Sequence, residues 1–70
     1  MKICFILLTY FINSNPHDLY VKNIDITELI DFAPRCNLAN SERTLIEFDN
    51  RWMCVRESPR EILDKIKDCK

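Results

Sequence analysis

The chain contains no glycine. Tight turns need a backbone with positive φ, which glycine adopts at little cost, and Asn and Asp are the other residues that tolerate it. Turns are therefore expected where Asn, Asp and Pro gather. Three such places divide the chain: residues 13–18, residues 37–41 after Pro34, and the pair Asp49-Asn50.

The last of these turns predicts a β-hairpin. Two strand-like runs, Thr44–Phe48 and Arg51–Val55, flank Asp49-Asn50, a pair suited to a two-residue type I′ loop. That loop would place Ile46 opposite Met53, whereas a three-residue loop, which the sequence leaves open, would shift the pairing. In neither register is one face fully polar. Such a hairpin would carry more apolar surface than one helix can cover. We therefore expect the chain to self-associate.

A C-terminal helix is expected directly after the hairpin. Ser58 can cap the N–H of Glu61, Glu61 can reach back to Ser58, and Pro59 suits the first helical position. Apolar residues then recur at helical spacing and form one stripe that can pack on a sheet. The stripe consists of Ile62, Leu63, Ile66 and Cys69.

Residues 3–12 form the most apolar run of the chain. Ten residues are too few to span a bilayer as a helix, which takes about 20. The aromatic and β-branched content favours a strand, and an uncleaved signal-like or membrane-anchoring segment is the alternative. Because the run is apolar on both faces, we expect a strand covered on both sides, by its own domain and by a second subunit.

The middle segment, residues 23–33, allows two interpretations. Asp25 and Glu28 could form the capping box of a short helix. Alternatively, residues 24–26 make a single turn and residues 27–33 run as a strand. Since Pro34 leaves little room for a helix, the second interpretation is favoured.

The cysteines at positions 4, 36, 54 and 69 are widely spaced, and no C-x-x-C pair occurs. This spacing disfavours a zinc site. Cys4 and Cys54 lie within strand-like apolar runs, where a free thiol behaves as a small hydrophobe, so buried free thiols are predicted, with disulfides as the alternative. Free thiols imply a reducing compartment and a cytoplasmic location.

Charge and composition give little support for nucleic-acid binding or catalysis. Ten Lys and Arg against eleven Asp and Glu leave a net charge of -1, and no basic run exceeds one residue. The sole histidine, His17, has only Asp18 as a nearby acid. We expect no catalytic residue, no cofactor and no metal, hence no enzyme. The alternative, a small nucleic-acid-binding regulator, would use Arg35, Arg43, Arg51 and Arg56 beside Trp52.

Three stretches together resemble the small FlbD-type proteins found with flagellar genes. They are Tyr20–Asp25 with Ile26 and Ile30 behind it, the hairpin with its polar turn, and Val55–Ile62 with Ile66. The similarity covers roughly residues 18–68 and rests on a turn, a hairpin and a helix cap. It implies a bacterial or phage accessory or regulatory protein without catalytic residues.

Together these patterns predict one small α+β domain over residues 1–70: a small antiparallel β-sheet of four to five strands with one C-terminal α-helix. The expected function is a cytoplasmic, non-enzymatic protein-interaction or regulatory accessory module. We expect it to form a homo-oligomer through its apolar strands, to bind an unidentified protein partner, and to have no membrane span. The predicted interface residues are Phe5, Leu7, Phe11, Phe48, Trp52 and Met53.

Overall fold

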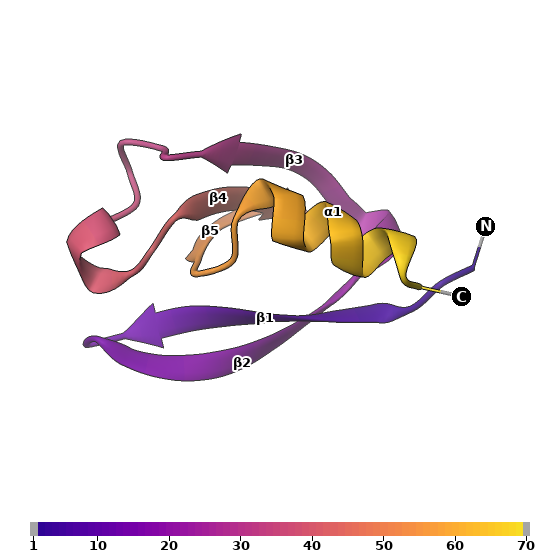
Figure 1. Ribbon diagram of the computed structural model, residues 1–70, viewed down its shortest axis with the longest axis horizontal. Helices are drawn as coiled ribbons and strands as arrows, with labels where there is room; N and C mark the ends of the chain where they lie inside the picture. Colours follow the sequence, from indigo (N-terminus) through magenta and orange to yellow (C-terminus); the bar gives the residue numbers. More distant parts are fainter. Residues whose placement is uncertain (1, 70) are drawn as a thin grey trace.

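A computed structural model describes residues 2–69 of the chain (Figure 1). These residues form strands and one α-helix, with two single turns of 3-10 helix between them. The elements in chain order are β1 (Phe5–Ile12), β2 (Asn15–Lys22), η1 (Asn23–Asp25), β3 (Ile26–Asp31), η2 (Leu38–Asn40), β4 (Thr44–Phe48), β5 (Arg51–Val55) and α1 (Pro59–Lys67).

The strands form two antiparallel sheets, one of β1 and β2 and one in the order β3-β4-β5. The α+β class and the C-terminal helix are confirmed, but the expectation of one continuous sheet is wrong in this detail. β1 and β5 are in contact, yet in the described part of the chain a single backbone hydrogen bond connects them, from the N–H of Arg56, the residue after β5, to the carbonyl of Thr9 within β1 at 2.9 Å. The Thr9 N–H instead donates to the side chain of Glu57, so the ladder does not continue.

The first hairpin turns more tightly than the sequence predicts. Its loop is Asn13-Ser14 alone, with φ of 52° and 66°, and β2 begins at Asn15. The predicted turn over residues 13–18 is therefore too long. Pro16 lies within β2 opposite Phe11. A proline is tolerated there because β2 is an edge strand.

The second hairpin has the predicted two-residue loop. Ile46 pairs with Met53, and Thr44 pairs with Val55. Asp49 and Asn50 have φ of 51° and 59°, the left-handed geometry of a type I′ turn. In a chain without glycine, short polar side chains thus supply the positive φ.

The turn-then-strand interpretation of the middle segment is confirmed. η1 makes the turn, and β3 follows and pairs with β4. The strand ends earlier than predicted, at Asp31, because Phe32 has a positive φ of 53° and leaves the extended conformation.

The core lies where the two sheets and the helix meet. α1 contacts both β1 and β3, and in Figure 1 it lies between them. The Ser58 hydroxyl accepts a hydrogen bond from the Glu61 N–H, as the capping box predicts. Of the predicted helix stripe, Ile62 is fully buried and Ile66 packs against the core, whereas Leu63 is exposed. The buried cluster consists of Ile6, Leu8, Val21, Ile46, Phe48, Val55 and Ile62.

All four cysteines are paired, so the prediction of buried free thiols is wrong. Cys4 binds Cys69 and Cys36 binds Cys54, with Cα–Cα distances of 6.2 and 5.6 Å. The first bond spans 65 residues and joins the start of β1 to the end of α1. The second attaches the β3–β4 loop to β5. Both pairs are brought together by tertiary structure, which cysteine spacing in the sequence does not reveal.

Candidate interaction surface

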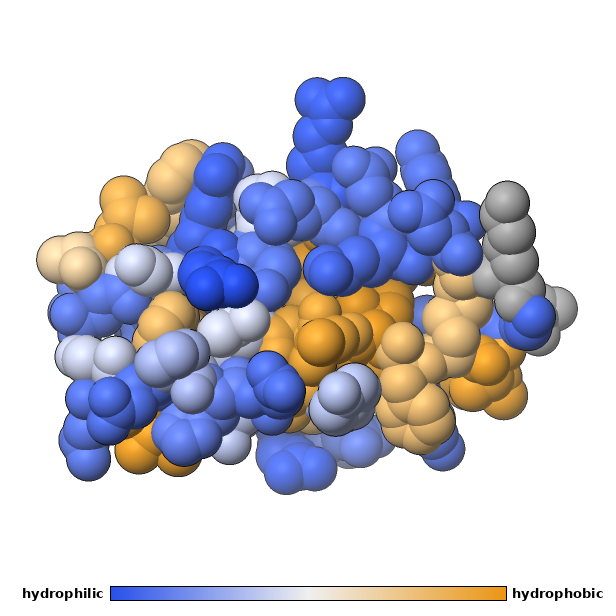
Figure 2. Space-filling view, turned by 60° about the horizontal axis from the view of Figure 1, so that its bottom comes forward, coloured by the Kyte–Doolittle hydropathy of each residue, from blue (hydrophilic) through white to orange (hydrophobic). Residues whose placement is uncertain are grey.

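The outer face of the β1–β2 hairpin carries exposed apolar side chains. Alternate residues of β1, such as Ile6 and Leu8, point into the core, so Phe5 and Leu7 point the other way. Leu7 pairs with Tyr20 across the hairpin. The exposed fractions are 63% for Phe5, 40% for Leu7 and 62% for Tyr20. Figure 2, which turns this side of the molecule forward, shows apolar side chains gathered from the middle of the face toward its right end, with hydrophilic residues above and below them.

The six predicted interface residues are divided between this face, the core and the second sheet. Phe5, Leu7 and Phe11 share the outer face of β1, where Phe11 is half-buried. Phe48 is 6% exposed and belongs to the core cluster, and Met53 packs against that cluster. Trp52 is partly exposed on the opposite face of β5 from Met53.

A groove brings three of the predicted residues together. Phe5, Phe48 and Met53 line it, and its volume is ≈ 280 Å³. It lies between β2 and the β4–β5 turn. Apolar side chains and charged side chains of both signs line it. The charged residues along it are Lys22, Asp25, Asp49 and Arg51.

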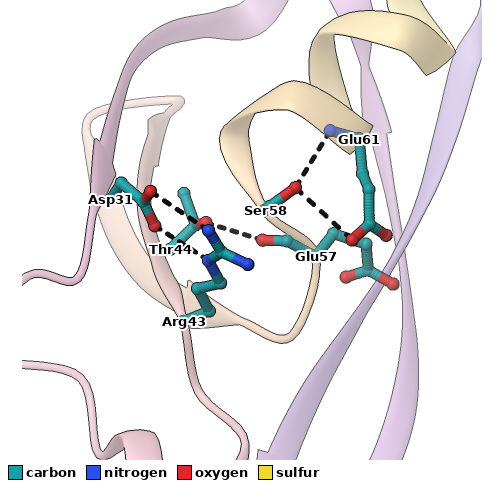
Figure 3. Close-up of polar contacts among 6 residues, drawn as sticks. All are labelled: Asp31, Arg43, Thr44, Glu57, Ser58 and Glu61. Carbon is teal, nitrogen blue, oxygen red and sulfur yellow. Dashed lines mark hydrogen bonds and ion pairs between the residues drawn. The ribbon is translucent and has the colours of Figure 1, made fainter.

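Buried polar contacts attach β1 to the start of the helix. The Glu57 carboxylate accepts hydrogen bonds from the Thr9 N–H at 2.8 Å and from the Thr9 hydroxyl at 3.0 Å. The Thr44 hydroxyl donates to the Glu57 backbone carbonyl at 2.6 Å, the contact visible in Figure 3. Glu57 is buried, and these hydrogen bonds connect it to β1 and β4. This residue fixes the position of β1 and thereby of the exposed apolar face.

Replacing Glu57 by alanine is expected to lower the free energy of unfolding by about 2 kcal/mol, because the Thr9 N–H and hydroxyl would be left buried without partners. Urea denaturation measures the change. Glu28→Ala, at an exposed position of β3, is the matched control and should change stability by less than about 0.5 kcal/mol. Equal stabilities of the two variants would contradict the role assigned to Glu57.

A second polar cluster lies at the end of β3. The Arg43 guanidinium donates to the Asp31 carboxylate at 3.0 and 3.4 Å, and this hydrogen bonding raises the pKa of Arg43 (Figure 3). The same guanidinium lies 4.6 Å from the centre of the Phe32 ring. Arg43 is thus engaged within the chain. Arg51 and Trp52 are neighbours in β5 and point to opposite faces, so they do not form one basic-aromatic surface.

Side chains that could bind a metal ion do not gather in the described part of the chain. Within residues 2–69, no group of three or more His, Cys, Asp and Glu side chains could hold a metal ion. His17 lies in β2, and its ring centre is 5.4 Å from that of Tyr10. The α-helix that the structure describes is too short to cross a membrane.

Comparisons with protein-family models, with curated proteins and with solved structures find no match for this chain. The similarity to FlbD-type proteins stays a prediction. Sequence reasoning named Phe5 and Leu7 as interface residues but not Tyr20, because the predicted first turn covered half of β2 and so hid the cross-strand register. The sequence contains little signal for the shorter turn, because Asn13-Ser14 is followed by Asn15-Pro16-His17-Asp18, a run in which Asn, Pro and Asp disfavour a strand.

Proposed function

We propose that the chain is a small non-enzymatic protein-interaction module that self-associates through the outer face of the β1–β2 hairpin. The observation that carries this proposal is the adjacent exposure of Phe5, Leu7 and Tyr20 on one side of two paired strands. Isolated apolar residues on a surface are ordinary, but a contiguous group that is rimmed by polar residues marks an interaction site.

The way the fold holds these residues supports the proposal. β1 is fixed on its inner face by the core, at Thr9 by Glu57, and near its start by the bond between Cys4 and Cys69. A rigid strand loses little conformational freedom when a partner covers it. Tyr is also well suited to an interface, since its ring is apolar and its hydroxyl can remain hydrated.

Replacing Leu7 by serine is expected to weaken self-association by roughly tenfold to a hundredfold, because each copy would then bury one leucine side chain fewer in the interface. Sedimentation velocity over a concentration series measures the change. Because Leu7 is partly exposed, the variant should remain folded by circular dichroism.

The control is Leu38→Ser, which changes an equally apolar residue exposed on η2, away from the hairpin. It should associate like the unmodified chain. If both variants, or neither, changed the association, the proposed surface would be the wrong one.

The disulfides bear on where the module acts. A cytoplasmic location was predicted from free thiols. Because all four cysteines are paired, they no longer support that prediction. Disulfides form and persist in oxidising environments, and small domains there gain stability from them. We therefore propose an oxidising compartment as the place where the chain folds and self-associates.

A further inference from the structure

β2 has an open edge. It pairs with β1 alone, and in Figure 1 it is the lowest strand along most of its length. Its last residues, including Tyr20 and Lys22, also line the groove between β2 and the β4–β5 turn. The N–H of Asn23 donates to the carbonyl of Cys4, which fixes the alternation of hydrogen bonds in this hairpin. Every second residue of β2 therefore directs its backbone polar groups away from β1. The residues that present both an N–H and a C=O in this way are Asp18, Tyr20 and Lys22.

We infer that the partner at this edge is β2 of a second copy, paired antiparallel about a two-fold axis at Tyr20. This inference rests on the proposed self-association and specifies its geometry. Tyr20 would face Tyr20 of the second copy, and each Asp18 would face Lys22 of the other copy. All three residues present outward backbone groups, so each facing pair would exchange two hydrogen bonds.

Charge complementarity favours this pairing. In the symmetric arrangement Asp18 meets Lys22 twice, once on each side of the axis, and opposite charges directly across strands are stabilising. Within residues 2–69 neither residue forms an ion pair, since the ion pair found there joins Asp31 to Arg43. Both are exposed and free to reach a second copy.

Two other registers, with the axis at Asp18 or at Lys22, are less favourable. An axis at Asp18 would place the two Asp18 carboxylates opposite each other and would bring Pro16, which has no N–H, into the ladder. An axis at Lys22 would oppose two lysines and would extend the pairing into η1, where the strand has ended. The register centred on Tyr20 avoids both conflicts.

The same register extends the exposed apolar face across the two copies. Leu7 pairs with Tyr20 within each hairpin. Four strands in the order β1-β2-β2-β1 would therefore place Leu7, Tyr20, Tyr20 and Leu7 in one continuous row. The backbone pairing and the apolar surface of the proposed function thus become parts of a single interface.

The test exchanges the two charges. Asp18→Lys should place two lysines opposite each other, and Lys22→Asp should oppose two acids, so each single variant is expected to raise the dimer dissociation constant by roughly tenfold or more. The double variant D18K/K22D restores opposite charges and should recover the dimer. Mixing the two single variants should produce a heterodimer, which native mass spectrometry distinguishes by mass.

A control and the contrary outcomes complete the test. Glu28→Lys makes the same size of charge change at an exposed position of β3 and should leave the dimer unaffected. A dimer that both single variants retain, without preference for the heterodimer, would overturn the β2 pairing while leaving self-association intact. If the unmodified chain is itself monomeric, the proposed function fails and this geometry fails with it.

Discussion

Replacing Cys4 and Cys69 together by serine is expected to lower the free energy of unfolding by about 4 kcal/mol. This disulfide closes a segment of 65 residues, nearly the whole chain, and the loss of chain entropy in the unfolded state grows with the length of the closed loop. A domain of this size has only a small stability margin. The variant should therefore be largely unfolded at physiological temperature, as circular dichroism and urea denaturation would show.

The pair Cys36 and Cys54 provides the comparison. It closes 18 residues, for which the same relation gives about 3 kcal/mol. Both cysteines of a pair must be changed together, so that no single thiol remains to form a wrong bond. An unchanged unfolding midpoint in either double variant would show that the corresponding disulfide does not contribute to the fold.

Replacing Ile62 by alanine should lower the free energy of unfolding by about 3 kcal/mol, because it leaves a cavity where the helix meets both sheets. Ile62 is the helix residue of the buried cluster, and it packs with residues of both hairpins. Its loss therefore weakens the contact that unites the two sheets.

The adjacent residue is the matched control. Leu63 lies on the same helix but is 49% exposed, so Leu63→Ala should cost less than about 1 kcal/mol. Urea denaturation of the two variants side by side measures the difference. Similar losses at both positions would mean that the helix packs through a different face.

Features determined by neighbouring residues could be predicted from the sequence. The loop Asp49-Asn50 needs only its own backbone preference to set the register of β4 and β5. The Ser58 cap depends on residues within one helical turn. The fold class follows from these two elements together with the apolar run that became β1.

Features that depend on distant residues could not be predicted. Glu57 and Thr9 are 48 residues apart, and nothing near either of them indicates that a carboxylate will interrupt the ladder between β1 and β5. The division into two sheets follows from that contact. Likewise, Cys4 meets Cys69 only because the helix runs back along β1 to the start of the chain.

The residues of the candidate surface could be predicted only in part, because their exposure also depends on what distant parts of the chain cover. The two-sided apolar character of residues 3–12 is local, and it led to Phe5 and Leu7 being named, which are exposed on β1. Phe48 was assigned to the interface because the hairpin is apolar on both faces. The structure buries it instead, since the β1–β2 hairpin and α1 together cover that face.

Self-association is the central claim, and sedimentation equilibrium of the unmodified, oxidised chain tests it most directly. The expected result is a species of twice the chain mass at micromolar concentration, which dissociates toward the single-chain mass on dilution. A folded species of single-chain mass over the whole concentration range would contradict both the proposed function and the paired β2 edge.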